Sequence, residues 1–191
     1  MTNVLIDFER RGPVALLTFS RPDQLNAMSG AMVEEILAAI AEAAGDPVIR
    51  ALVLRGAGGN FMAGADVKAY ATQSAEAFRD FQESAGRVYG ALEALPKPVI
   101  AAVEGYALGG GFEIALSADL IVAHADARLG LPEVKLGLVP GGGGTQRLAR
   151  KLGPNRAAEL LMTGRFASAQ EMASWGVVNR VAEDALGEAL A

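Results

Sequence analysis

An acidic residue inside an apolar run is the feature that most limits how this sequence can fold. Residues 105–133 read GYALGGGFEIALSADLIVAHADARLGLPE. They place Glu113 in an apolar helical segment directly after three glycines, and Glu133 behind a proline twenty residues later. Apolar neighbours can hold a carboxyl group away from water. Glycines leave room for a ligand's carbonyl to approach the backbone N–H groups beside it. We therefore expect the fold to be organised around this stretch.

Short β-rich runs alternate with helical segments along the chain. Residues 4–8 and 14–19 predict an antiparallel hairpin, because they flank a turn with the sequence Arg-Arg-Gly-Pro. Apolar residues at helical spacing predict an amphipathic helix over residues 31–44. Further strands are expected at residues 51–54, 99–103, 120–123, 128–131 and 177–181, and further helices at residues 74–95, 110–117, 145–151, 154–163, 168–175 and the end of the chain.

Three smaller expectations complete this layout. Residues 105–109 should form a turn, residues 165–166 should be extended, and Ser168 should cap the helix that follows it. No linker or shift in composition divides the chain. Its length and its 51% of hydrophobic residues fit one well-buried core, so we expect a single α/β domain over residues 1–191.

Composition excludes several classes of protein. The net charge of -5 argues against a nucleic-acid-binding surface, and the absence of cysteine excludes disulfides and thiolate chemistry. No uncharged apolar run reaches the ~18 residues that span a bilayer. The mixed-charge start MTNVLIDFERRGP does not resemble a signal peptide. We therefore expect a cytoplasmic protein that does not bind a membrane.

The glycines before Glu113 indicate a site for a developing oxyanion. Gly110 and Glu113 share one helix face, and the N–H of Gly110 lies in the first turn, where it has no partner inside the helix. Residues 61–66 are the best source of a second donor, because their small side chains let the backbone approach a ligand. Glu133 would complete the site if the fold brings it opposite Glu113.

Each of these features also has a plainer interpretation. Glu113 could point to solvent, and Glu133 could be a first-turn carboxylate favoured by the helix dipole. The glycines at residues 141–144 could form a flexible loop or a phosphate cradle, although they lack the Lys-Ser/Thr ending of a P-loop. His124, the one histidine, fits the cap of a strand end better than a catalytic or zinc site.

A cluster of basic residues leaves a second alternative open. These side chains could contact phosphate or RNA, or they could be ordinary charges of helix ends and solvated faces. The cluster consists of Arg147, Arg150, Lys151, Arg156 and Arg165.

Five segments of the sequence resemble those of the enoyl-CoA hydratase/isomerase family, the crotonase group. In family order they are RPDQLNAM (21–28), NFMAGADVK (60–68), GYALGGGFEIALSAD (105–119), LGLPEVKLGLVPGGGGTQRLAR (129–150) and WGVVNRV (175–181). The resemblance implies an α/β crotonase-like spiral of ββα units, with two sheets that meet at an angle and are flanked by helices.

The resemblance also implies a role for each candidate residue. The backbone N–H groups of Ala63 and Gly110 would hold the thioester oxygen of an acyl-CoA. Glu113 would activate water for attack at C3 of a 2,3-enoyl thioester, and a protonated Glu133 would deliver a proton to C2. The N–H of Gly141, expected at the head of the next helix, would help to hold the water.

Two further segments match those that bind the pantetheine and adenine parts of coenzyme A. Coenzyme A enters as part of the acyl-CoA substrate, and the resemblance implies neither a permanently bound cofactor nor a metal. The matching residues are Gln24, Leu25, Ala27, Gly64, Ala65 and Asp66, with Lys68 as a phosphate contact.

The pair of glutamates favours one activity within the family. Members that only isomerise double bonds, decarboxylate or dehalogenate usually lack one of the two, so the sequence predicts a hydratase of fatty-acid or related acyl-CoA metabolism. An isomerase, another crotonase-type acyl-CoA lyase, and an inactive acyl-CoA- or RNA-binding relative remain as alternatives.

Family members usually continue into a helical region that covers the site and forms trimers or pairs of trimers. This chain stops at Ala191, so we expect a domain without that region, and a homotrimer or hexamer if the region is not essential.

Overall fold

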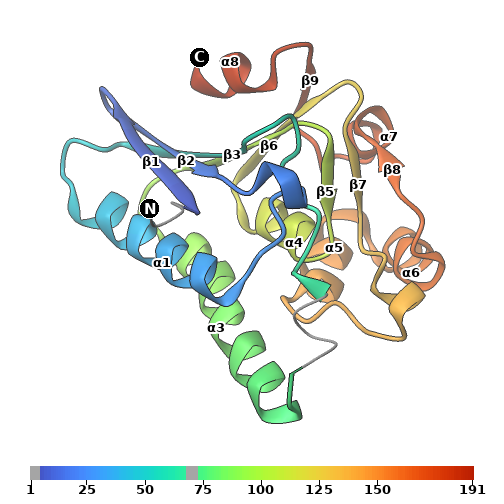
Figure 1. The fold of residues 1–191 in the computed structure, drawn as a ribbon. Helices are drawn as coiled ribbons and strands as arrows, with labels where there is room; N and C mark the ends of the chain where they lie inside the picture. Colours follow the sequence, from blue (N-terminus) through green and yellow to red (C-terminus); the bar gives the residue numbers. More distant parts are fainter. Residues whose placement is uncertain (1–4, 68–72) are drawn as a thin grey trace.

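A six-stranded sheet forms one layer of the computed structural model, which describes residues 5–67 and 73–191 (Figure 1). Its strand order is β1-β2-β3-β4-β6-β9. The first two strands pair antiparallel, which confirms the predicted hairpin, and every later pair in this sheet is parallel. Val4, where the hairpin was expected to begin, lies outside the described residues. The strands are β1 (Ile6–Arg11), β2 (Val14–Phe19), β3 (Ala51–Gly56), β4 (Val99–Val103), β6 (Leu120–His124) and β9 (Arg180–Ala182).

A second sheet of three short strands runs across the first at a steep angle (Figure 1). It contains β5 (Tyr106–Leu108), β7 (Arg128–Gly130) and β8 (Ala167–Ser168). The chain visits the two sheets in turn, since β4 leads to β5 and then to a helix, and β6 leads to β7. The expected crotonase-like arrangement of ββα units in two angled sheets is therefore confirmed.

Helices cover both faces of the large sheet. Three of them begin at serines whose side chains accept a hydrogen bond from the first turn, Ser29, Ser74 and the predicted cap Ser168. The last helix, α8, packs on the face opposite α1 and α3 (Figure 1). None of the helices in the described part of the chain is long and apolar enough to cross a membrane. The helices are α1 (Gly30–Gly45), α3 (Ala75–Ala94), α4 (Gly110–Ser117), α5 (Gly144–Leu152), α6 (Pro154–Thr163), α7 (Ala169–Ser174) and α8 (Ala185–Leu190).

The expected turn at residues 105–109 is wrong, because its middle forms strand β5. The two glycines at its ends do have the positive φ that is typical of glycines in turns, 53° at Gly105 and 52° at Gly109. Between them, Tyr106–Leu108 pairs in parallel with β7, whose residues lie more than twenty positions away. The extended segment also lies later than expected, at Ala167–Ser168, and β9 starts at Arg180 rather than at residue 177.

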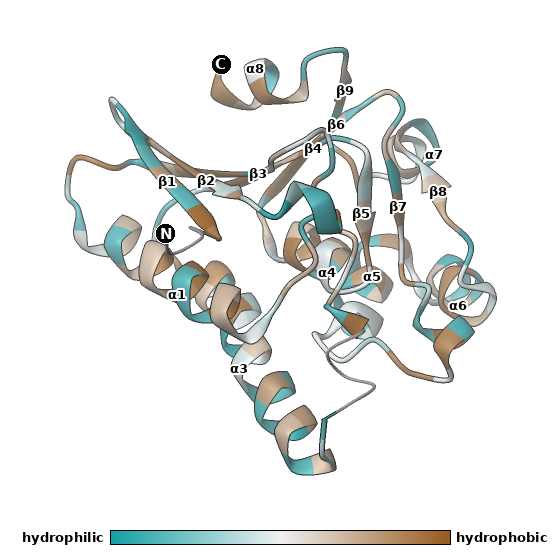
Figure 2. Ribbon diagram, viewed as in Figure 1, coloured by the Kyte–Doolittle hydropathy of each residue, from teal (hydrophilic) through white to brown (hydrophobic). Residues whose placement is uncertain are grey.

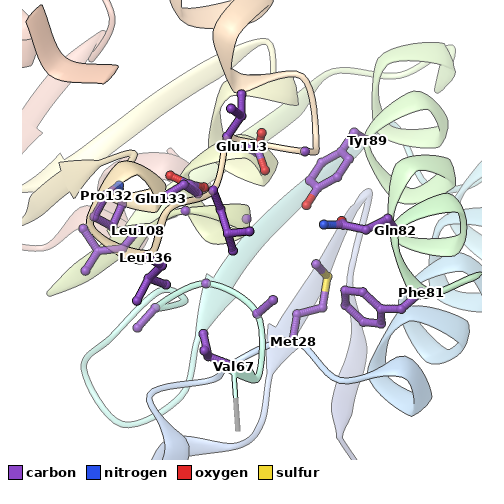
Figure 3. Close-up of a pocket in the computed structure, with 18 residues that line it drawn as sticks. Met28, Val67, Phe81, Gln82, Tyr89, Leu108, Glu113, Pro132, Glu133 and Leu136 are labelled. Carbon is purple, nitrogen blue, oxygen red and sulfur yellow. The ribbon is translucent and has the colours of Figure 1, made fainter. Parts of the chain in front are cut away.

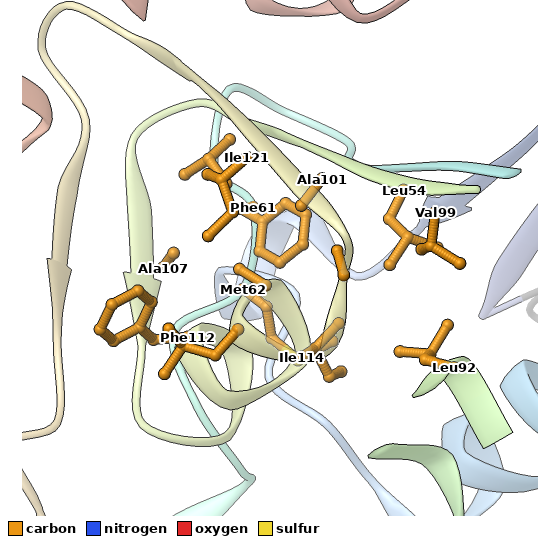
Figure 4. Close-up of a cluster of buried hydrophobic side chains, with 14 of the residues drawn as sticks. Leu54, Phe61, Met62, Leu92, Val99, Ala101, Ala107, Phe112, Ile114 and Ile121 are labelled. Atoms are coloured by element: carbon orange, nitrogen blue, oxygen red, sulfur yellow. The ribbon is translucent and has the colours of Figure 1, made fainter. Parts of the chain in front are cut away.

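Helix α4 lies inside the hydrophobic core, and this placement positions the functional site. Its residues from Gly111 to Ser117 are all buried, as expected of a helix that is apolar on every side. Phe112 and Ile114 pack against Phe61 and Met62 (Figure 4). Figure 2 shows the contrast with the edge strand β1, which is largely hydrophilic. Helix α4 can approach the backbone of Met62 this closely because Gly111 has no side chain.

Replacing Gly111 by alanine should destabilise the protein. A Cβ at this position would lie 2.1 Å from the carbonyl oxygen of Met62, so α4 would have to move away from the core. We expect a loss of about 1–3 kcal/mol or more in the free energy of unfolding. The matched control is Gly86→Ala in α3, where nothing lies within 4 Å and where alanine should add about 0.5–1 kcal/mol. Urea unfolding of both variants measures this, and equal midpoints would contradict the account.

Candidate active site

The carboxyl group of Glu113 is buried at the start of α4 and held by backbone donors. Glu113 is 2% exposed, and its Oε1 accepts a hydrogen bond of 2.7 Å from the N–H of Gly144, the first residue of α5. Burial raises the pKa of this carboxyl. Hydrogen bonds from the N–H groups of Gly144 and Gly142, and the positive charge of Arg147, act in the opposite direction and limit the rise. Glu113 does not point to solvent.

The glycines at residues 141–144 form the wall around Glu113. A Cβ on Gly142 would lie 2.6 Å from Oε2 of Glu113, and one on Gly144 would lie 2.9 Å from Oε1. This run is therefore a cradle for a carboxylate of the protein itself, rather than a flexible loop or a phosphate cradle. The predicted water-holding residue, Gly141, lines the same pocket but precedes α5 by three residues. Its contact with a water stays a prediction.

The carboxyl group of Glu133 reaches the same pocket from a 3-10 helix, η2 (Glu133–Leu136). Its Oε1 lies 3.2 Å from where a Cβ of Gly109 would be. Its Oε2 is buried and has no hydrogen-bond partner among the described residues. Burial raises the pKa of Glu133 to about 7, and the negative charge of Glu113 adds to this rise. Glu133 is thus both a first-turn residue and a pocket residue, with its carboxyl partly protonated at neutral pH.

The two carboxyl groups lie at one end of a cavity of about 140 Å³ (Figure 3). Tyr89 and Gln82 of α3 face them from the other side, and Met28 and Phe81 supply apolar surface. Sequence reasoning missed these four residues. On an amphipathic helix, the spacing of Phe81 and Tyr89 fits ordinary core packing, so it carries no separate signal for a pocket.

The predicted oxyanion donors need one correction. The N–H of Ala63 already donates to the carbonyl of Leu25 at 3.0 Å, so this N–H is not available to a ligand. Two residues further on, the N–H of Ala65 lies 4.0 Å from the Cβ position of Gly110. Within residues 5–67 and 73–191, neither the N–H of Ala65 nor that of Gly110 has an acceptor. The pair that faces the pocket is therefore Ala65 and Gly110.

A groove continues from this cavity along the loop after β2. The two share Ala65 and Val67 as lining residues. The structure brings most of the predicted coenzyme A-binding residues to this groove, while Gly64 lines the cavity and Lys68 lies outside the described residues. The groove residues among those predicted are Gln24, Leu25, Ala27, Ala65 and Asp66.

Two side chains hold the loop that forms this groove. Asn26 is fully buried; its Oδ1 accepts from the N–H of Arg21 at 2.8 Å, and its Nδ2 donates to the carbonyls of Ala57 and Asn60. Arg21 forms an ion pair of 3.0 Å with Asp66 and also hydrogen-bonds to Gln24 and Ala27. Neither Arg21 nor Asn26 was singled out from the sequence, where they are ordinary polar residues of a loop.

The basic cluster is partly neutralised by acidic partners. Arg147 pairs with Glu93 at 2.7 Å, and Arg165 pairs with Glu159 and Glu171 at 2.6 and 2.8 Å. Arg156 and Arg165 also stack on the ring of Trp175. His124 lies at the end of β6, where its Nδ1 accepts from the N–H of Asp126 at 3.1 Å, as a strand-end cap would.

Known proteins resemble this chain over nearly its whole length. Residues 9–189 match the family described as Enoyl-CoA hydratase/isomerase. A short-chain-enoyl-CoA hydratase of Clostridium acetobutylicum is 43% identical over 96% of this chain and 70% of its own length. A crotonyl-CoA hydratase of Syntrophomonas wolfei is 40% identical over 95% of this chain and 69% of its own length.

Solved structures agree with these sequence relationships. The crystal structure of an enoyl-CoA hydratase from Bacillus anthracis superposes with a TM-score of 0.93 at 39% identity, and covers 97% of this chain and 72% of that one. An enoyl-CoA hydratase subunit of Geobacillus kaustophilus gives a TM-score of 0.89 at 44% identity with the same coverage. Family match, identity and fold lead to one conclusion: the chain belongs to the enoyl-CoA hydratase/isomerase (crotonase) family.

Proposed function

We propose that this protein hydrates 2,3-enoyl-CoA thioesters to 3-hydroxyacyl-CoA. The observation that carries the proposal is the pair of carboxyl groups in one cavity, with Glu113 held by backbone N–H donors and Glu133 left with an unpartnered buried oxygen. At Glu113 the donors and Arg147 oppose the effect of burial, whereas at Glu133 burial and the charge of Glu113 both favour the carboxylic acid. Two glutamates can serve as base and acid only when their surroundings give them different pKa values.

The thioester oxygen would bind between the N–H groups of Ala65 and Gly110. Both are free of acceptors within the described residues, and Gly110 is the first residue of α4, where the helix dipole favours negative charge. Removing one such donor typically costs about 3–4 kcal/mol of transition-state stabilisation. In this proposal Ala65 takes the role that the resemblance suggested for Ala63.

Chemistry would begin with a water beside Glu113. The carboxylate takes a proton from the water, whose oxygen forms a bond to C3 of the substrate. The electrons of the C2–C3 double bond move toward C2 and the thioester oxygen, where the two N–H groups stabilise the enolate. Glu133 then gives its proton to C2. The product carries the elements of water, and the two carboxyl groups exchange protons with solvent before the next turnover.

The groove lined by Gln24, Leu25, Ala27 and Asp66 would hold the coenzyme A part of the substrate. It opens from the cavity at Ala65, so a thioester at Ala65 and Gly110 could extend its pantetheine arm into the groove. A phosphate contact at Lys68, assembly as a homotrimer or hexamer, and a place in fatty-acid or related acyl-CoA metabolism stay predictions from the family resemblance.

Two alternatives use the same structure differently. Double-bond isomerisation needs one carboxyl group to move a proton between carbons, and the presence of both Glu113 and Glu133 favours hydration over it. Binding of RNA through the basic cluster is less supported, because carboxylates already pair with Arg147 and Arg165.

Loss of the conjugated-enoyl absorbance of crotonyl-CoA measures the proposed activity. Glu113→Gln and Glu133→Gln should each lower kcat at least about 100-fold, because each removes a proton-transfer group. The control, Glu42→Gln on the exposed face of α1, should keep the wild-type rate. Wild-type rates in both site variants would contradict the mechanism.

Two further assays separate the alternatives. A 3-enoyl-CoA should give little conjugated product if hydration is the activity, whereas rapid formation of that product would favour an isomerase. Salt-dependent binding of RNA, without turnover of crotonyl-CoA, would favour the RNA-binding alternative.

The protonation state of Glu133 can be tested through stability. Between the ordinary pKa of a glutamate, about 4.3, and the raised pKa of about 7, the folded protein holds a proton that the unfolded chain has released. The stabilising effect of this proton is full below about pH 4 and is lost as the pH rises through 7. The variant Glu133→Gln has no carboxyl group at this position, so it does not lose stability in this way as the pH rises. Relative to wild type, the variant should therefore gain at least about 1 kcal/mol between pH 5 and pH 8 in urea unfolding. An equal difference at both pH values would contradict the raised pKa.

A further inference from the structure

Arg147 connects the base Glu113 to a carboxylate on a different helix. Its Nε and Nη2 donate to the two carboxylate oxygens of Glu93, both at 2.7 Å, in the bidentate geometry that makes arginine pairs strong. Its Nη1 donates to the carbonyl oxygen of Gly142. The side chain of Arg147 is only 14% exposed, whereas that of Glu93 is 47% exposed, so solvent screens the arginine end of this pair less than the carboxylate end.

The contact with Gly142 matters because this residue belongs to the cradle of Glu113. Gly142 and Gly144 supply the N–H groups that hold the Glu113 carboxylate. A run of glycines has unusual backbone freedom, and Gly143 has a left-handed φ of 87°. Arg147 fixes the carbonyl of this run, and Glu93 fixes Arg147 from α3. The direction of the two N–H groups therefore depends on a contact outside the pocket.

Arg147 also places positive charge near Glu113. The charged and titratable groups that face Glu113 are Arg147 from α5, Tyr89 from α3 and Glu133 from η2. Of these, Arg147 favours ionisation of Glu113, and the charge of Glu113 raises the pKa of Glu133. The guanidinium carbon of Arg147 lies 5.6 Å from the ring centroid of Tyr89, which packs against Gly142.

We propose that Arg147, clamped by Glu93, is a positioning residue that favours the ionised form of Glu113 by orienting the Gly142–Gly144 backbone and supplying positive charge. This inference rests on the proposed function for its meaning in catalysis, because Glu113 acts there as the base. Its physical content, the ionisation of Glu113, can be measured without turnover. The clamp touches no substrate, so its loss should change the pH dependence of the reaction more than substrate binding.

The direct test is a titration of Glu113 by carbon-13 NMR in protein labelled at the glutamate carboxyl carbon, with Glu113→Gln used to assign the signal. In Arg147→Met the midpoint of Glu113 should rise by about one unit or more, as expected when an opposite charge is removed. Arg147→Lys and Glu93→Gln should give smaller rises. Arg147→Lys keeps the positive charge without the bidentate geometry, and Glu93→Gln keeps the arginine without its carboxylate partner. These two conservative variants also carry the test if Arg147→Met does not fold.

The matched control is Arg87→Met, which removes another arginine that bridges two helices, paired with Glu34 at 3.1 Å on the exposed surface. It should leave the midpoint of Glu113 unchanged. In hydration assays, kcat of Arg147→Met should fall most on the acidic side of the pH profile, by up to about tenfold for a rise of one unit, recover as the pH rises, and leave KM within about threefold of wild type. The acidic limb of the pH–rate profile shifts to higher pH, because Glu113 must be ionised to act as the base.

Two results would overturn the proposal. One is an unchanged midpoint of Glu113 in folded Arg147 variants. The other is an equal loss of kcat at every pH, which a merely structural role would produce. An NMR shift in the variants together with a wild-type protein that does not hydrate crotonyl-CoA would instead overturn the proposed function, and would leave the clamp established.

Discussion

The hydrogen bond from the Gly144 N–H to the buried carboxylate of Glu113 is the contact on which the site depends. A carboxylate at this depth costs several kcal/mol unless donors replace its lost water. The donors come from the start of α5 and Glu113 from the first turn of α4, so the starts of these two helices must lie close together. The two helices are brought together by the core around Phe112 and Leu148, and the absence of side chains at residues 142 and 144 lets the backbone come close enough. Packing and chemistry are thus set by the same contact.

The two glutamates illustrate how one residue type acquires two characters. Both carboxyl groups are removed from water, which raises the pKa of each. At Glu113, backbone donors and Arg147 offset part of this rise, whereas Oε2 of Glu133 has no donor among the described residues and the charge of Glu113 raises the Glu133 pKa further. The difference between them arises from backbone geometry and from one distant ion pair, not from the residues themselves.

Much of this site follows from local sequence, and the parts that do not follow depend on distant partners. The burial of Glu113 could be predicted because its own neighbours are apolar, and Ser168 could be predicted as a cap from its position. Strand β5 could not, because only pairing with β7 distinguishes it from a turn. The shift from Ala63 to Ala65 has the same origin. In a loop of small residues every N–H is a candidate, and only the folded structure shows that the N–H of Ala63 already donates to Leu25. The glycine cradle and Tyr89 likewise acquire their roles from helices that the sequence does not place in space.

A crystal structure with butyryl-CoA, a saturated thioester that cannot be hydrated, tests the central claim most directly. The account predicts the thioester oxygen within about 3 Å of both the Ala65 and the Gly110 nitrogen atoms. It also predicts that C2 and C3 of the acyl chain lie between the carboxyl groups of Glu133 and Glu113. A thioester oxygen bound at Ala63, or turned away from the start of α4, would contradict the account.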